Sequence, residues 1–218
     1  YFNVHDQFLY VLKYFDKSDE DSYKRYNHEI DFYKFNKNRH PFICKCYGQI
    51  INGNNIYIVI EYIEGQTLKE LIENGKIELN ENQIMNIILD IMSSLEYLHL
   101  NDFYYRDLKS NNIMIDSSLN AKLIDFDCSK LYDGNLNTSE IGCDDFASPE
   151  QKVSNEYSFE TDIYSLGKMI YYIINEKIPE ISIDECLKQV NINEFQKLNE
   201  IYTKCINPIL DERPSCSK

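Results

Sequence analysis

Two short stretches near the middle of the chain limit its fold and function more than any other feature. They are Tyr105–Asn112 (YRDLKSNN) and Lys122–Asp127 (KLIDFD), and each places an aspartate at the end of a hydrophobic run. A base, a cation and metal-binding oxygens close together are what phosphoryl transfer needs. The candidates for these roles are Asp107 as a proton acceptor, Lys109 as a phosphate-binding cation, and Asn112 and Asp125 as ligands of a divalent cation.

Length, composition and charge set broad limits. The 218 residues suffice for one large domain or two small lobes, and with 43% hydrophobic and 13% aromatic residues the chain can bury a substantial core. The net charge of −14 argues against a general surface for nucleic acid or anionic membranes. An acidic balance mildly favours basic substrates, but it more often reflects solubility alone.

The cysteines indicate the compartment. Seven are scattered without C-x-x-C pairs or histidines at zinc spacing, and their odd number favours a reducing, cytoplasmic environment over a disulfide framework. We find no signal peptide and no apolar run long enough to span a bilayer. Because the chain starts at Tyr1 rather than Met, we expect it to be a piece of a longer protein.

The first third predicts strands around one helix. The apolar run at residues 8–15 reads as a buried strand, and the pattern at 23–35 as a helix that carries Glu29. Lys13 lies inside this strand, where it either pairs with Glu29 or extends to solvent from an edge strand. Strands at 43–50 and 56–62, joined by the turn-forming sequence NGNN, predict a hairpin, and Gly65 marks a hinge.

The remainder is mainly helical. Asn80 and Gln83 predict a capped helix start, followed by isoleucines and leucines at helical spacing up to Leu98. Short strands at 113–115 and 121–124 predict a hairpin that holds Asn112 near Asp125. Further helices are predicted at 162–175, 183–190 and 192–206, after a long polar loop that follows Asp125.

In this order, the motifs resemble the eukaryotic protein kinase family, serine/threonine type. YRDLKSNN is similar to the catalytic loop H-R-D-x-x-x-x-N, DFD to the metal-binding D-F-G, YVLK (residues 10–13) to V-A-I-K, and SPE (148–150) to A-P-E. The resemblance implies an α+β, two-lobed fold. Residues 1–62 would form the remainder of a small antiparallel lobe, truncated by the loss of its first strands, and residues 63–218 a larger helical lobe.

The resemblance also implies a nucleotide site for ATP. Lys13 would contact the α- and β-phosphates and Glu29 would pair with it. Glu61 and Ile63 would offer backbone groups to adenine, and Ile60 would guard the back of the pocket. Val11 and Met114 would line the adenine pocket, where Val11 replaces the family's smaller alanine.

Further roles follow from the same resemblance. Asp107 would accept the proton of a protein Ser/Thr hydroxyl, Lys109 would stabilise the transferring phosphoryl group, and Asn112 and Asp125 would hold Mg²⁺. Several other residues would have structural or regulatory roles: Arg106 with a phosphosite at Thr138 or Ser139, the pair Glu150–Arg213, Asp162 as support of the catalytic loop, and a hydrophobic spine of Cys46, Tyr33, Phe126 and Tyr105.

Four departures from the family pattern leave an alternative open. No G-x-G-x-x-G precedes Lys13, Asp127 replaces the glycine of D-F-G, and Cys143 stands where a threonine is usual. Val11 is the fourth departure, and Tyr105 in place of histidine is a milder change. The expected function is ATP-dependent phosphorylation of protein Ser/Thr hydroxyls, and the alternative is a pseudokinase that acts as a scaffold or binding module.

Overall fold

The computed structural model describes residues 8–75, 79–132, 145–154, 157–176 and 196–215. The strands are β1 (Tyr10–Asp16), β2 (Cys46–Asn52), β3 (Asn55–Glu61), β4 (Gly65–Thr67), β5 (Phe103–Tyr104), β6 (Ile113–Asp116), β7 (Ala121–Leu123) and β8 (Lys130–Leu131). The α-helices are α1 (Glu20–Asn36), α2 (Leu68–Glu73), α3 (Glu81–His99), α4 (Pro149–Ser154), α5 (Phe159–Asn175) and α6 (Gln196–Cys205). Short 3₁₀ turns occur at Ser110–Asn112 and Leu210–Glu212.

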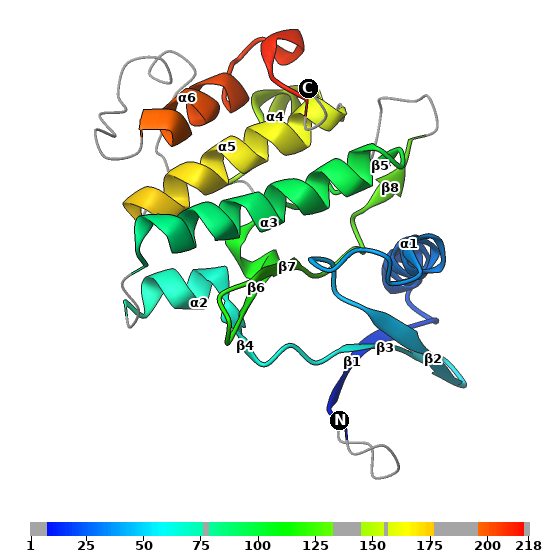
Figure 1. Cartoon of the computed structure of the whole chain (residues 1–218). Coiled ribbons are helices and arrows are strands. Elements are labelled where there is room, and N and C mark those ends of the chain that lie inside the picture. Colours follow the sequence, from blue (N-terminus) through cyan, green and yellow to red (C-terminus); the bar gives the residue numbers. More distant parts are fainter. Residues whose placement is uncertain (1–7, 76–78, 133–144, 155–156, 177–195, 216–218) are drawn as a thin grey trace.

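The smaller part is an antiparallel sheet with strand order β1-β3-β2, and α1 lies beside it (Figure 1). In this register Lys13 is opposite Ile58 and Phe15 is opposite Ile56. Phe15, Ile56 and Ile58 are buried, so this face of the sheet packs into the core with α1. The predicted strands and the hairpin are therefore present, with ends shifted by a few residues.

Helix α1 begins three residues before the predicted start because its cap lies in the polar stretch. The Asp19 side chain accepts a hydrogen bond from the Ser22 amide, and Glu20 and Asp21 place negative charge in the first turn. Both features stabilise a helix N-terminus. The helix ends where Lys37 adopts a left-handed conformation.

The larger part is built on helices α3, α5 and α6, which lie side by side in Figure 1. Asn80 and Gln83 form the predicted capping box of α3. Helices α5 and α6 approach closely at Gly167, where an added Cβ would lie 2.7 Å from Ile206 Cγ2. The predicted helix at 192–206 corresponds to α6, whereas the one predicted at 183–190 falls outside the described residues.

Between the two parts runs a small sheet with strand order β4-β6-β7. Ile113 is opposite Leu123 in the predicted hairpin β6–β7, and Gly65 is opposite Asp116. Elements β4, β5, β8, α2 and α4 have no counterpart in the sequence prediction. The α+β, two-lobed architecture is confirmed, while the boundary between residues 62 and 63 stays a prediction.

Within the part of the chain that the structure describes, no helix combines the length and apolar character needed to cross a bilayer.

The substitution Gly65→Ala tests the close contact of β4 with β6. An added Cβ would lie 2.0 Å from the carbonyl oxygen of Ile115, a backbone atom that cannot rotate away. We expect a loss of about 2 kcal/mol in the free energy of unfolding, measured by urea denaturation. Ser117→Ala, in the neighbouring exposed turn, is the control and should change this quantity by less than ~0.5 kcal/mol. Unchanged stability of Gly65→Ala would contradict this packing.

Candidate active site

The loop between β5 and β6, the predicted catalytic loop, is held from inside by Tyr105. This side chain is fully buried, and its hydroxyl donates to the Ile124 carbonyl at 2.5 Å and more weakly to the Asn112 carbonyl at 3.4 Å. The Ile124 amide in turn donates to the Asn112 carbonyl at 3.0 Å. The loop and the segment that begins at Asp125 are therefore tied together directly beside both predicted metal ligands.

Asp162, in the first turn of α5, supports the same loop from the other side. Its two carboxylate oxygens accept hydrogen bonds from the amides of Tyr105 and Arg106, each at 2.9 Å. His99 Nε2 lies 2.9 Å from Asp162 Oδ2. Arg106 has φ of 73°, in the left-handed region that non-glycine residues adopt only with support from their surroundings. The carboxylate supplies that support.

Asp107 is a buried carboxylate with two polar partners on one oxygen. Its Oδ2 accepts hydrogen bonds from Lys109 Nζ at 2.5 Å and Asn112 Nδ2 at 2.8 Å. Burial raises the pKa of Asp107 above its ordinary value, although both partners act in the opposite direction. Because Asn112 donates through its nitrogen, its side-chain oxygen is the atom that could bind a metal.

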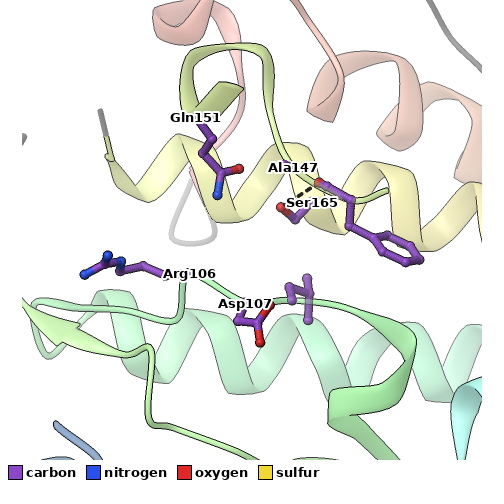
Figure 2. A pocket seen from close by; sticks show the side chains of 7 residues that line it. Arg106, Asp107, Ala147, Gln151 and Ser165 are labelled. Carbon is purple, nitrogen blue, oxygen red and sulfur yellow. Dashed lines mark hydrogen bonds between the residues drawn. The ribbon is translucent and has the colours of Figure 1, made fainter. Parts of the chain in front are cut away.

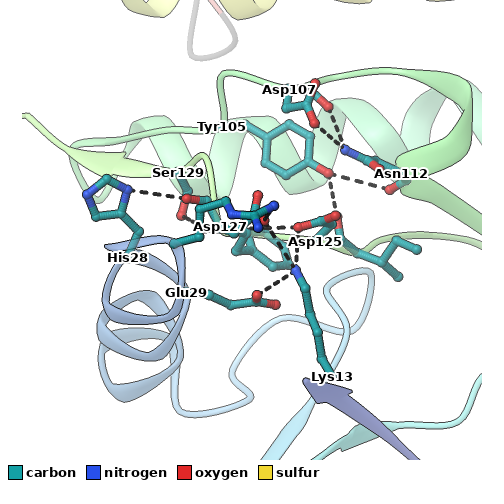
Figure 3. A network of polar contacts seen from close by, with 12 residues as sticks. Lys13, His28, Glu29, Tyr105, Asp107, Asn112, Asp125, Asp127 and Ser129 are labelled. Atoms are coloured by element: carbon teal, nitrogen blue, oxygen red, sulfur yellow. Dashed lines mark hydrogen bonds and ion pairs between the residues drawn. The ribbon is translucent and has the colours of Figure 1, made fainter. Parts of the chain in front are cut away.

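Lys13 lies among three carboxylates, as Figure 3 shows. Its Nζ is 2.6 Å from Glu29 Oε2, 2.6 Å from Asp125 Oδ1 and 3.7 Å from Asp127 Oδ2. Of the two arrangements that the sequence left open for Lys13, the ion pair with Glu29 is thus the one formed. The ammonium group of Lys13 therefore connects strand β1, helix α1 and the segment Asp125–Asp127.

Charge and burial compete in this cluster. Burial alone would lower the pKa of Lys13, but the three neighbouring carboxylates raise it above its usual value, so the ammonium stays charged. Burial raises the pKa of Glu29 to about 7 against the effect of Lys13. For Asp125 the outcome is reversed: burial would raise the pKa, but Lys13 and the hydrogen bonds of Asp127 together lower it below its ordinary value.

Residues predicted to contact adenine lie on β1, on β3 and in the segment that follows it, and on β6. Val11 is opposite Ile60 in the register of β1 and β3, and Ile63 is buried in the core. The Glu61 amide donates to the Lys45 carbonyl at 2.9 Å, and its side chain pairs with Lys122 at 2.6 Å. The expected backbone contact of Glu61 with a nucleotide therefore falls on its carbonyl oxygen.

Met114, the remaining predicted adenine contact, is partly buried and packs against the same core from β6.

A narrow hollow opens beside Asp107, and Figure 2 shows its lining. It lies between the catalytic loop and the segment before α4, and its walls are Arg106, Asp107, Leu108, Phe146, Ala147, Gln151 and Ser165. Ser165 on α5 fixes the outer wall, since its hydroxyl donates to the Phe146 carbonyl at 3.0 Å. The hollow borders the Asp107 carboxylate, and in this structure it has no room for a water-sized group.

Two arginines attach the segment around α4 to the rest of the large lobe. The guanidinium of Arg213 binds both oxygens of Glu150, at 2.6 and 2.9 Å. The guanidinium of Arg106 lies 4.6 Å from the ring centre of Tyr157, a contact that the sequence did not suggest. The other predicted residues near here, Thr138, Ser139 and Cys143, lie outside the described residues.

The predicted spine is present as ring contacts around Phe126. Its ring centre lies 5.7 Å from that of Tyr33 and 5.4 Å from that of Tyr105, and Cys46 packs against the same core. Sequence reasoning missed Phe32, which stacks on Phe126 at 4.0 Å with an angle of 13° between the rings. The available signal was the spacing of Phe32, three residues after Glu29.

The candidate metal ligands are few in number. Within the described ranges, no three His, Cys, Asp or Glu side chains form a preformed metal cluster. Magnesium in phosphoryl-transfer sites is usually held by one or two protein oxygens together with substrate phosphates. Asp125 and the side-chain oxygen of Asn112, tied together by the Ile124 amide, fit that requirement.

A protein kinase domain model matches residues 1–217. The chain belongs to the protein kinase family. The motifs of this family occur along the chain in the family's order, and the elements described above carry them, from Lys13 on β1 to Asp162 on α5.

Curated relatives are similar over most of the chain. The SNF1-related protein kinase catalytic subunit alpha KIN12 of Arabidopsis thaliana is 34% identical over 142 residues, which make up 64% of this chain and 28% of that protein. The serine/threonine-protein kinase dst4 of Dictyostelium discoideum is 31% identical over 196 residues, 81% of this chain and 40% of that protein. Protein kinase kin1 of Schizosaccharomyces pombe is 37% identical over 145 residues, 65% of this chain and 16% of that protein. The matched regions thus span less than half of each of these proteins.

The buried pair Glu150–Arg213 generates a stability prediction. We expect Arg213→Ala to lower the free energy of unfolding at pH 7 by about 3 kcal/mol, because it leaves a partly buried carboxylate without its cation. The exposed cation Lys152 on the same helix as Glu150 provides the control, and Lys152→Ala should have little effect. Urea denaturation measures both.

The same pair predicts a pH dependence. Burial would raise the pKa of Glu150, but Arg213 lowers it below the ordinary value of 4.5. Stability from a lowered native pKa is present above pH 4.5 and is lost as the pH falls through the native value. The stability gap between wild type and Arg213→Ala should therefore narrow below pH 4.5, and a gap that stays constant there would contradict the assignment.

Proposed function

We propose that this protein transfers the γ-phosphoryl group of ATP to Ser/Thr hydroxyls of protein substrates. The observation that carries the proposal is the convergence of Lys13, Glu29 and Asp125 in one ion cluster, with Asp107 and Asn112 hydrogen-bonded to each other on the adjoining loop. These are the groups that phosphoryl transfer requires, and they come from distant parts of the chain.

In the proposed mechanism, Asp107 orients the substrate hydroxyl and accepts its proton. Burial raises the pKa of this carboxyl, which makes it a better proton acceptor than an exposed aspartate. Lys109, already 2.5 Å from Asp107, stabilises negative charge on the transferring group. The hollow beside Asp107 marks the side from which the substrate hydroxyl would approach once its walls move apart.

Lys13 binds the α- and β-phosphates, and Glu29 holds its ammonium in place. Val11, Ile60, Glu61, Ile63 and Met114 are the residues that we assign to adenine binding. Asp125 and Asn112 would hold Mg²⁺, which neutralises phosphate charge when bound. The donor set supports this assignment, because it offers hard oxygens and leaves room for phosphate oxygens to complete the coordination.

Two features support specificity for serine and threonine. Lys109, two residues after Asp107, resembles the serine/threonine branch of the family, and the relative from Dictyostelium discoideum is named a serine/threonine-protein kinase.

Regulation is part of the same proposal. A phosphate at Thr138 or Ser139 would be bound by Arg106.

We infer a reducing, cytoplasmic location from the thiols. The cysteines in the described ranges, Cys44, Cys46, Cys128 and Cys205, are all free. Burial raises the pKa of Cys44 and Cys205 to about 12, so these two are inert thiols that pack in the core.

The decisive variant is Asp107→Asn. It keeps the size of the side chain but cannot accept the proton, so we expect kcat to fall by roughly 10²–10⁴-fold with little change in the KM for ATP. Transfer of radiolabelled phosphate from Mg·ATP to a basic Ser/Thr peptide measures it. Asp211→Asn, at an exposed site far along the chain, is the matched control.

The outcomes separate the two candidate functions. Equal activity of Asp107→Asn and wild type would exclude Asp107 as the base. Mg·ATP binding or partner binding with no transfer by wild type would favour the alternative, a pseudokinase that acts as a binding module. Asp127, in the position of the family's glycine, is the feature in the described part of the site that favours this alternative.

A further inference from the structure

One face of α1 is directed at the segment Asp125–Asp127. Arg25, His28, Glu29 and Phe32 follow the spacing i, i+3, i+4, i+7 that places side chains on one side of a helix. Phe32 stacks on Phe126, and Glu29 reaches the same segment through Lys13. Within the segment Asp125–Asp127, Arg25 and His28 contact Asp127.

Asp127 is contacted by α1 through both its side chain and its backbone. Its Oδ2 lies 3.9 Å from Arg25 Nη1 and 3.7 Å from Lys13 Nζ, while His28 Nδ1 lies 3.2 Å from its carbonyl oxygen. A carbonyl oxygen can only accept a hydrogen bond, so Nδ1 of His28 is the donor. The Asp127 side chain is 10% exposed and that of Lys13 is 23% exposed, whereas that of Arg25 is 58% exposed, so water screens the contact with Arg25 more than the contact with Lys13.

A glycine at position 127, as in the family's D-F-G, could accept the hydrogen bond from His28 through its carbonyl oxygen. It could not make the charged contacts with Lys13 and Arg25. Its conformational freedom is not needed here, because Asp127 does not lie in the left-handed region, whereas Asp125 has φ of 63°. The substitution therefore adds a carboxylate between Lys13 and Arg25 without the backbone strain that a positive φ would impose.

We propose that Asp127 is a positioning residue that holds α1 against the segment Asp125–Asp127, a contact that we call the clamp, and so keeps Glu29 beside Lys13. Asp125 is shared between Lys13 and the expected metal, whereas Asp127 is aimed at Lys13 and Arg25. The contacts of Asp127 would therefore persist whether Asp125 pairs with Lys13 or binds the metal. This inference deepens the proposed function, but its first test does not depend on catalysis.

The first test is hydrogen–deuterium exchange of the α1 amides in protein free of nucleotide and metal. We expect Asp127→Asn, which removes only the charge, to speed exchange in α1 by about fivefold, the size that a partly buried ion pair supports. Asp127→Gly, which restores the family's residue and is expected to fold, should give an equal or larger increase. Asp211→Asn is the matched control and should leave α1 unchanged.

A double-variant comparison assigns the effect to the contact. Arg25→Gln should also speed α1 exchange, and it should add little in the Asp127→Asn background because the pair is already lost. Lys24→Gln removes a neighbouring exposed cation from the same helix and should have the same small effect in both backgrounds. Additive effects of Arg25→Gln and Asp127→Asn would overturn the ion-pair part of the proposal.

Kinetics then connect the clamp to the site. If Asp127 positions Lys13 and Glu29, Asp127→Asn should raise the KM for ATP severalfold and leave the KM for the peptide unchanged. Unchanged α1 exchange in both Asp127→Asn and Asp127→Gly would overturn the proposal, whatever the activity. Faster α1 exchange in a protein that shows no phosphotransfer would support the clamp and count against the proposed function alone.

Discussion

The geometry of the site depends on the hydrogen bonds that the carboxylate of Asp162 accepts from the loop that carries Asp107. This carboxylate accepts hydrogen bonds from two successive backbone amides, those of Tyr105 and Arg106, and Arg106 itself has a positive φ that turns the chain after it. That turn aims Asp107 toward Lys109 and Asn112. The long helix α5 therefore acts as a rigid base for a loop that has little regular structure of its own.

The same loop is joined to the smaller lobe through Tyr105 and Phe126. The hydroxyl of Tyr105 bonds the strand that leads to Asp125, and the Phe126 ring lies between Tyr105 and the aromatic residues of α1. Movement of α1 therefore changes the surroundings of Asp125 and Lys13 together. If these residues bind nucleotide as proposed, nucleotide binding and the position of α1 would be coupled through these side chains.

Much of the fold was predictable because its main elements have strong local signals. Helix α3 has a capping box and isoleucines at helical spacing, and the β2–β3 hairpin has a glycine turn between apolar strands. Strand β4 and helix α2 were missed because they are three and six residues long, too short for periodicity to show. Their stability comes from partners distant in sequence, such as Ile115 opposite Gln66.

Similar reasoning applies to the site. Motif residues such as Asp107 and Asn112 lie within one short stretch, so their proximity could be predicted. The contacts of Asp127 with Arg25 and His28 could not, because nothing in either segment specifies how α1 is rotated. That rotation is set by packing, with Phe32 on Phe126 as its centre. The stacking of Arg106 on Tyr157 was missed for the same reason.

The ion pair between Lys13 and Asp125 joins residues 112 positions apart in the chain. Closing so long a loop costs conformational entropy that only the completed core can offset, so this contact should form late in folding. An intermediate with a folded helical lobe alone would contain Asp125 but would lack Lys13, the cation that pairs with it. Complete folding is thus the step that brings Lys13 to Asp125, so a partly folded chain would lack the ion cluster on which the proposed activity depends.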